Sequence, residues 1–338
     1  MNRVNIFRYS RGSNLNVAIF GWLLDFAKYG GELQDIGIQM IRDILEDKDL
    51  EIKSIKPLSM YKNIALVVEI NDDYLLSVED ITFAKNKCSM LKKHREILIT
   101  DPKYLDRKKK FVYINIGNKM KSNHREGENC IRVTRYHLLK LLCKYEGPTM
   151  SLIDEYKDYL IYLDKMTHSH AWEDSFESWH RLSWEGFFEK FKEKDSKSDW
   201  ENISSQKGDS IILIWNRITK EYRIDENKSQ KYAVYATIET ELPCKYNYNV
   251  NKYKPFMHLK VEVLEGRYKS DIRNYVWNII EEKKKKYENN GFYIEKTSHA
   301  IGTHMTIGRV ENITDKQILT DYIEKIEKLL KEFDKLAE

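Results

Sequence analysis

The chain has 338 residues, a mass of 40.4 kDa and a formal net charge of +4, with 33% charged and 41% hydrophobic residues. This composition is typical of a soluble globular protein, excludes disorder over most of the chain, and favours two structural units over one. The positive charge is too small to indicate nucleic-acid binding unless it is gathered in a local cluster.

The sequence favours neither a membrane protein nor a structural zinc protein. No apolar run approaches the roughly 18 residues that a spanning helix needs, and the N-terminal segment lacks the apolar core of a signal peptide. The four cysteines, Cys88, Cys130, Cys143 and Cys244, form no C-x-x-C pair, so we expect reduced thiols. The predicted location is the cytoplasm.

Helices and strands alternate in the first half of the chain. Hydrophobic periodicity predicts helices over residues 14–29, 33–47, 85–99 and 136–145, and strands near residues 51–57, 63–80 (a hairpin), 111–116 and 131–134. This order predicts an α/β unit in which a mixed sheet is covered by helices on both faces.

The second half begins after Gly147-Pro148, which breaks the pattern. Residues 151–195 are predicted to be helical, and their aromatic residues are expected to pack in a core rather than to stack on bases. Those aromatic residues are Trp172, Phe176, Trp179, Trp184, Phe187 and Phe188.

A polar loop at residues 194–209 is predicted to separate this helical segment from a C-terminal α+β domain. That domain is expected to have strands at 210–218, 232–240, 256–265, 292–297 and 304–310, and helices at 268–288 and 313–336. The predicted organisation is a first domain at 1–146, a helical connector at 147–204 and the α+β domain at 205–338.

A set of short motifs in the first 195 residues resembles a known family. They are Asn-Ile-Phe at 5–7, Phe-Gly-Trp-Leu-Leu-Asp at 20–25, the hairpin at 61–82, the basic helix end at 92–98, the strand at 112–117 and Ser-Trp-Glu-Gly-Phe-Phe at 183–188. In this order they resemble the PD-(D/E)XK nuclease superfamily, in particular a bacterial branch with a Trp-Leu-Leu signature. The resemblance implies a restriction-endonuclease-like fold, and active relatives cut DNA, often beside restriction or phage-defence systems.

The same resemblance implies where a catalytic site would lie. Active members carry a Glu and a His at the first helix, an Asp on the first hairpin strand, a Glu and a Lys on the second, and a Gln on the next helix. The matching positions are Ser13, Asn16, Ala65, Glu79, Ile81 and Met90. Only Glu79 keeps the family residue, whereas a hydrolytic Mg²⁺ needs several oxygen ligands and the lysine would stabilise developing charge.

Two functions follow from this pattern. The preferred one is a catalytically inactive nuclease-fold protein that needs no cofactor, and that binds DNA or RNA or serves as a regulatory or assembly protein beside a protein partner. The alternative is an active Mg²⁺-dependent endonuclease with a relocated site at Glu79, Lys85 and Lys87, with Glu69 as a replacement acid. Asp80 adjoins Glu79 but should point to the opposite face of the strand. Glu79 would otherwise pair with Lys85 or Lys87.

Candidate phosphate contacts cluster in the nuclease-like half. They are Arg107, Lys108, Lys109, Lys110, Lys119 and Lys121, and a solvated surface explains them equally well. In residues 205–338 the sequence shows no catalytic constellation, and His304 has no ligand spacing. No P-loop or G-x-S-x-G motif is present.

Overall fold

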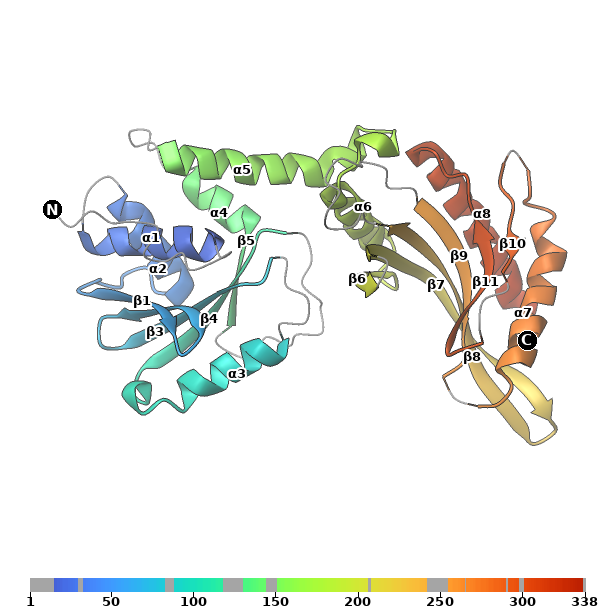
Figure 1. Ribbon diagram of the computed structural model, residues 1–338, viewed down its shortest axis with the longest axis horizontal. Coiled ribbons are helices and arrows are strands. Elements are labelled where there is room, and N and C mark those ends of the chain that lie inside the picture. The colour runs from blue at the N-terminus through green and yellow to red at the C-terminus, as the bar shows by residue number, and fades with distance from the viewer. Residues whose placement is uncertain are drawn as a thin grey trace. The chain divides into compact units, whose positions relative to one another are not determined.

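The computed structural model describes residues 15–29, 33–82, 88–117, 130–143, 151–205, 208–241, 255–264, 266–289, 291–297 and 301–336. The chain forms two compact units that divide between Asp164 and Lys165. This division lies inside helix α5 (Ser151–His168), between the predicted limits at residues 146 and 204 (Figure 1). None of the described helices combines the length and the apolar character that a membrane crossing requires.

The first unit is built on a mixed five-stranded sheet. Its strands, in spatial order, are β1 (Ile55–Tyr61), β2 (Ile64–Ile70), β3 (Tyr74–Asp80), β4 (Lys108–Asn115) and β5 (Cys130–Thr134). The first three strands are antiparallel, and β4 and β5 continue in parallel with β3. Every residue of β2 is buried, which is typical of a central strand covered on both faces.

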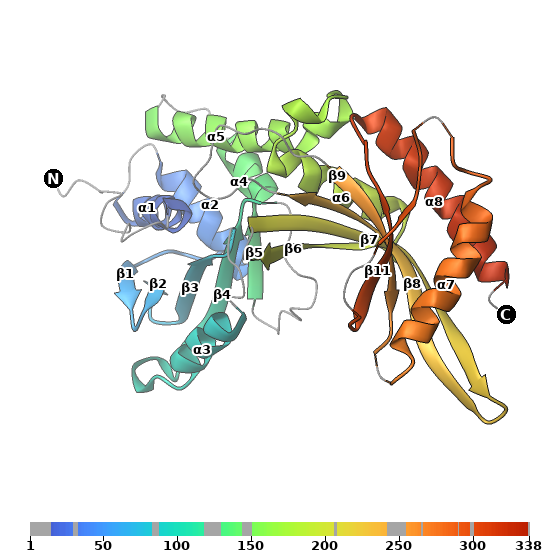
Figure 2. The same cartoon turned by 45° about the vertical axis from the view of Figure 1, so that its right-hand side comes forward.

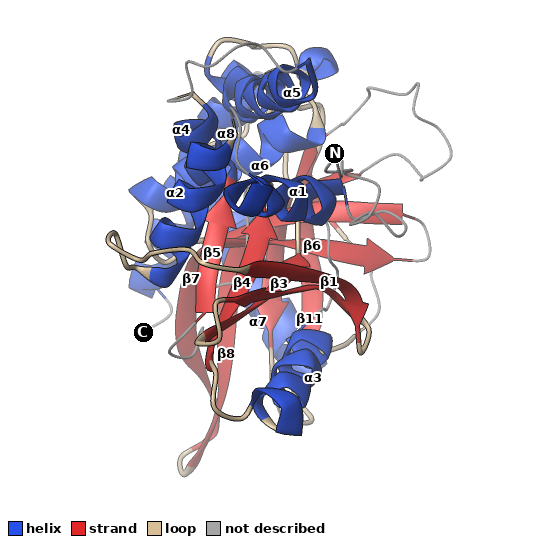
Figure 3. Cartoon of the chain, turned by 90° about the vertical axis from the view of Figure 1, so that its left-hand side faces the viewer, coloured by secondary structure: helices blue, strands red, loops and turns tan. Residues whose placement is uncertain are grey.

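Helices cover both faces of this sheet, as the sequence predicts. Helices α1 (Leu15–Tyr29), α2 (Gln34–Leu45) and α4 (Arg135–Leu142) lie on one side, and α3 (Cys88–Ile99) lies on the other (Figures 1 and 3). The α3 side is held by a hydrophobic cluster that includes Val67, Leu75, Leu91, Leu98 and Phe111. On the α1 side, the N-terminal part of α5 contacts α1.

The first strand lies further along the chain than the predicted residues 51–57. Its position is set by a two-residue turn, Lys62-Asn63, in which both residues have positive φ, 49° and 70°. Such a turn pairs Tyr61 directly with Ile64 and fixes the hairpin register. Pro57 is tolerated because β1 is an edge strand, where the missing N–H need not pair.

The second unit is built on a six-stranded antiparallel sheet. Its spatial order is β10-β11-β9-β8-β7-β6, with β6 (Asp199–Ser205), β7 (Gly208–Asp225), β8 (Lys228–Glu241), β9 (Pro255–Glu262), β10 (Glu295–Lys296) and β11 (His304–Val310). The prediction of a polar loop over 194–209 is wrong, because β6 lies within it and pairs along its length with β7. Trp200 anchors β6 in the core with 1% of its surface exposed. The β7–β8 hairpin is also longer than predicted.

One face of this second sheet carries the helices of the unit. Helices α6 (Arg181–Lys194), α7 (Lys269–Lys284) and α8 (Lys316–Leu336) share a single core with the inward residues of β7, β8, β9 and β11. Figure 2 shows α7 and α8 on the same side of the sheet. The aromatic residues Phe176, Trp179, Trp184 and Phe188 lie in this core, which confirms that part of the prediction; Trp172 is 58% exposed, so the prediction is wrong for it.

Close packing explains why glycine occupies position 186 in the Trp-Glu-Gly-Phe-Phe motif. A Cβ atom at this position would lie 2.0 Å from the backbone oxygen of Thr167. Helix α6 can therefore pack this closely against the segment that ends α5 only because residue 186 has no side chain.

Candidate functional site

Four of the six positions that the resemblance implies, Ala65, Glu79, Ile81 and Met90, lie at the face of the first sheet that α3 covers. The β2–β3 register pairs Leu66 with Val78, and its continuation by one residue places Ala65 opposite Glu79. The backbone nitrogen of Ala65 lies 3.5 Å from Oε1 of Glu79. Ile81 follows on the same face because alternate strand residues share a face. Ile81 belongs to the cluster under α3, and Met90 packs against it.

Asn16 does not join this group. It lies on α1, on the other side of the sheet, where its Nδ2 donates to Oδ2 of Asp80 at 2.9 Å. Its Oδ1 accepts a hydrogen bond from the hydroxyl of Tyr156 at 3.1 Å. Asp80 thus points away from Glu79, as strand alternation predicts. Ser13, Lys85 and Lys87 are outside the described residues.

Glu79 forms a buried pair with a histidine to which the sequence analysis gave no role. Oε1 of Glu79 lies 2.7 Å from Nδ1 of His94, and the two residues are 4% and 8% exposed. When the carboxylate is ionised it can only accept hydrogen bonds, and Nδ1 of His94 is then the donor of this contact. His94 lies one turn after Met90 on α3, and that spacing was the only signal in the sequence that it shares the site.

Two further polar side chains lie on the same face. Burial, reinforced by the neighbouring Cys130 thiol, raises the pKa of Tyr113 above its usual range. Asn115 is fully buried, and its Oδ1 accepts a hydrogen bond from the backbone nitrogen of Gly117 at 3.0 Å. The β3–β4 register continues so that Asn115 lies beside Ile81. Neither residue supplies a second carboxylate.

The described residues of this face do not fit a divalent-metal centre. Ala65 and Ile81 offer no side-chain oxygen, and the carboxylate of Glu79 is engaged by His94. In the part of the chain that the structure describes, no group of three or more His, Cys, Asp or Glu side chains is arranged to hold a metal ion. A Mg²⁺ ion that is to compete with water for protein ligands would need more oxygens than are present here.

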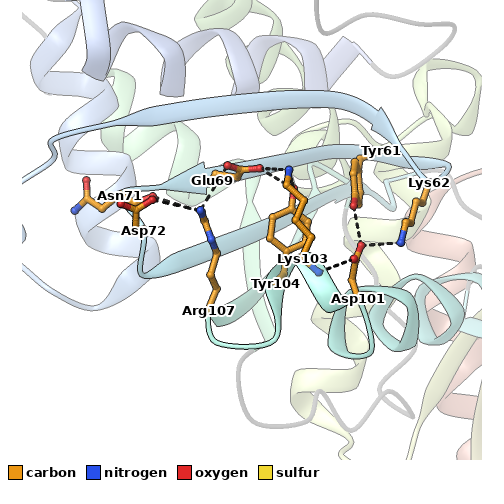
Figure 4. A network of polar contacts seen from close by, with 9 residues as sticks. All are labelled: Tyr61, Lys62, Glu69, Asn71, Asp72, Asp101, Lys103, Tyr104 and Arg107. Atoms are coloured by element: carbon orange, nitrogen blue, oxygen red, sulfur yellow. Dashed lines mark hydrogen bonds and ion pairs between the residues drawn. The ribbon is translucent and has the colours of Figure 1, made fainter.

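Glu69, the possible replacement acid, has a structural role (Figure 4). Its Oε1 accepts hydrogen bonds from Nζ of Lys103 and from the hydroxyl of Tyr104, both at 2.7 Å. Burial opposes ionisation, but these bonds outweigh it and lower the pKa of Glu69. Glu69 lies four positions along β2 from Ala65, roughly 13 Å of strand, so Glu69 cannot share a ligand with Glu79.

The same network orients the turn between β1 and β2 (Figure 4). Asp101 accepts hydrogen bonds from the hydroxyl of Tyr61 at 2.7 Å and lies 2.8 Å from Nζ of Lys62. The bond from Lys62 holds the pKa of Asp101 below its usual range. Burial and the bond to Asp101 raise the pKa of Tyr61 to about 12. Lys62 is thereby positioned while 47% of its side chain stays exposed.

The described candidate phosphate contacts, Arg107 and the three lysines that begin β4, do not form one surface. Arg107 pairs with Glu69 and Asp72, and Lys110 pairs with Glu46 at 3.1 Å. Nζ of Lys109 donates to backbone carbonyls, including that of Arg107 at 3.0 Å. Lys108 is exposed, with its Nζ 5.3 Å from the centre of the Tyr74 ring. Lys119 and Lys121 are not among the described residues.

A small cavity of about 290 Å³ opens beside His94. We call it the His94 pocket. It is lined by Lys62 and Asn63 of the β1–β2 turn and by Ser89, Met90, Lys93 and His94 of α3. Every polar side chain among these can donate a hydrogen bond, and none of the described lining residues carries a carboxylate.

A second polar cluster lies on the sheet of the second unit, on the face opposite the helices. Oε1 of Glu239 lies 2.6 Å from Nζ of Lys260, 3.1 Å from Nδ1 of His258 and 3.0 Å from the hydroxyl of Thr237. Burial opposes ionisation of Glu239, but His258 and Lys260 outweigh it and lower its pKa to about 2.

The same face carries a second ion pair, between Glu262 and Arg217 at 2.5 Å. Neither set of contacts is predicted by the sequence motifs. The signal was the alternation of polar residues along β8 and β9, which puts Thr237 and Glu239, and His258, Lys260 and Glu262, on one face.

Comparisons of the chain with protein-family models, with curated proteins and with solved structures return no match. The likeness to the nuclease superfamily therefore rests on the sequence motifs alone. Function has to be inferred from the side chains that the fold brings together.

Proposed function

We propose that this chain is a nuclease-fold protein that does not catalyse metal-dependent cleavage and binds nucleic acid through its first unit. The observation that carries the proposal is the buried pair of Glu79 and His94, whose facing atoms are 2.7 Å apart. At the position where the resemblance implies a cation, the remaining carboxylate is held by an imidazole of the protein itself.

The surroundings of the pair support the loss of catalysis. A buried carboxylate is costly unless it is paired and hydrogen-bonded, and His94 meets that need without a metal ion. Ala65 and Ile81 are both buried, and Ile81 packs in the hydrophobic cluster under α3. At Glu79 the protein's own side chain thus takes the role of a ligand, and apolar residues occupy the neighbouring positions.

The charge around α3 supports binding to a polyanion. The helix carries Lys92, Lys93 and Arg95 next to His94, and Lys62 projects from the neighbouring turn. Lys92 and Lys93 are both exposed. Clustered cations of this kind attract nucleic-acid phosphates through Coulomb forces and the release of counterions. A restriction or phage-defence setting is part of the proposal through the resemblance.

A cleavage assay tests the first half of the proposal. Wild-type protein and Glu79→Ala are incubated with DNA and RNA in Mg²⁺, in Mn²⁺ and in a chelator. We expect no divalent-dependent products from either protein. Cleavage by the wild type that disappears in Glu79→Ala would overturn the proposal and favour the relocated site with Lys85 and Lys87.

A salt titration of binding tests the second half. We expect the logarithm of the association constant to fall linearly with the logarithm of salt concentration, with a slope of about −0.7 to −0.9 for each phosphate contacted. Fluorescence anisotropy with labelled oligonucleotides measures it, and chelator should leave the affinity unchanged. Absent or salt-insensitive binding to both DNA and RNA would point instead to a protein partner.

A further inference from the structure

The His94 pocket has the chemistry of an anion site. His94 is fixed in orientation because its Nδ1 is bound to Glu79. Its Nε2 has no hydrogen-bonding partner among the residues that the structure describes. The ring borders the cavity although 92% of its surface is buried. With Nδ1 facing Glu79, Nε2 donates to an anion when the ring is the imidazolium, in which both nitrogens carry protons. Because the ring is already held in place, its position costs little entropy when a ligand binds.

Two lysines complete the charge of the pocket. Lys93 is exposed and has no ion-pair partner in the described ranges. Lys62 is oriented by Asp101, and nearly half of its side chain stays accessible. The backbone of the Lys62-Asn63 turn fixes where the Lys62 side chain starts, because both residues adopt the left-handed conformation. The remaining polar lining groups, an amide and a hydroxyl, can also donate hydrogen bonds.

The size of the pocket limits what it can take. The volume of about 290 Å³ is close to the lower limit for ligand pockets, which is about 300 Å³. This space suits a single tetrahedral anion with the atoms next to it. The charge then selects among phosphates: a monoester carries about −1.5 to −2 at neutral pH, whereas a phosphodiester carries about −1.

We infer that the His94 pocket binds a phosphate monoester, such as the 5′-terminal phosphate of a nucleic-acid strand, with Lys62, Lys93 and His94 in place of a metal ion. The inference rests on the proposed function and deepens it by naming the chemical group that this site recognises. Binding is a purely electrostatic and hydrogen-bonding event, and no bond is made or broken. Glu79 is a positioning residue that orients His94.

The test compares two single-stranded oligonucleotides of one sequence, one with a 5′-phosphate and one with a 5′-hydroxyl. We expect the wild type to bind the phosphorylated strand about tenfold more tightly, because each charge-assisted hydrogen bond adds substantially to affinity. Lys93→Ala should reduce this preference to about twofold or less. Lys92→Ala is the matched control, since Lys92 is an equally exposed neighbour that does not line the pocket.

A second arm identifies the source of the phosphate and separates this inference from the proposed function. Inorganic phosphate and adenosine 5′-monophosphate are titrated calorimetrically into wild type and Lys93→Ala. If the wild type binds these small anions, Lys93→Ala does not, and neither protein binds oligonucleotides, the result would support the anion pocket and contradict the nucleic-acid function. Equal affinity of the wild type for the two strands would contradict phosphate binding in the pocket while leaving general nucleic-acid binding in place. An equal loss of the preference for the 5′-phosphorylated strand in Lys92→Ala and Lys93→Ala would contradict it in the same way.

Discussion

Glu79 and His94 show how one residue can retain its place in a fold while its chemistry changes. A metal ion needs several accessible ligands, whereas a buried carboxylate needs to be paired and hydrogen-bonded, which groups of the protein can do. His94 lies 15 residues from Glu79 in the chain and meets it only because α3 packs on β3. The carboxylate is thereby held by a hydrogen-bonding contact with a side chain.

Glu239 lets the effect of one carboxylate on stability be measured. Its pKa is lowered from 4.5 to about 2, and its side chain is only 13% exposed. An acid whose pKa is lowered by folding stabilises the fold fully at pH values above its pKa in the unfolded chain. For Glu239 this contribution is lost as the pH falls from about 4.5 through about 2. At neutral pH the shift corresponds to about 3 kcal/mol.

We expect Glu239→Gln to be less stable than wild type at pH 7, and the difference to shrink as pH is lowered from 5 to 2. Urea unfolding at a series of pH values measures it. Glu226→Gln is a suitable control because Glu226 is exposed at the β7–β8 turn. A difference that stays constant across this pH range would show that Glu239 is not stabilised as an anion.

At the scale of single elements, the close contact at Gly186 gives a sharp prediction. The added methyl group of Gly186→Ala would meet backbone rather than a flexible side chain. We expect a loss of at least about 2 kcal/mol in the free energy of unfolding. Gly302→Ala is the control, because its nearest atom lies 4.0 Å away. Equal stability of the two variants, measured by chemical denaturation, would contradict the packing described here.

Elements with strong periodicity could be predicted from the sequence, and those without it could not. The runs of apolar residues in β2 and the regular apolar spacing of α8 placed these elements closely. Strand β6 was missed because Ser, Lys and Asp surround it, and Trp200 is the buried residue that marks its inward face among those whose burial is described. Its pairing with β7 is a tertiary fact that overrides local propensity.

Some residues of the candidate site could likewise be placed from the sequence, and others could not. Ala65, Glu79 and Ile81 could be placed together from strand alternation alone. Asn16 could not be placed, because its orientation depends on how α1 lies on the sheet. The pair with His94 and the donor-lined pocket depend on the position of α3, for which a hydrophobic pattern gives no angle or offset. Patterns within an element are local, whereas contacts between elements are set by packing.

At the scale of the whole molecule, each unit has a core of its own, so we expect two unfolding transitions. Leu76 is fully buried in the first unit and Leu213 in the second. Leu76→Ala and Leu213→Ala should each cost about 3 kcal/mol, and each should shift a different transition. Differential scanning calorimetry of the full chain separates them. One transition that both variants shift equally would show that the chain unfolds as a single cooperative unit.

The adjacent acids of β3 have a consequence for how this protein tolerates change. Glu79 reaches His94 through one face and Asp80 reaches Asn16 through the other. Slippage of β3 by one position would move one of the two carboxylates to the place of the other, where the donor could still bind it. The register of β3 must therefore be fixed by the hydrophobic residues that precede the two acids, Leu75, Leu76 and Val78. Inserting polar residues there would disrupt both contacts at once.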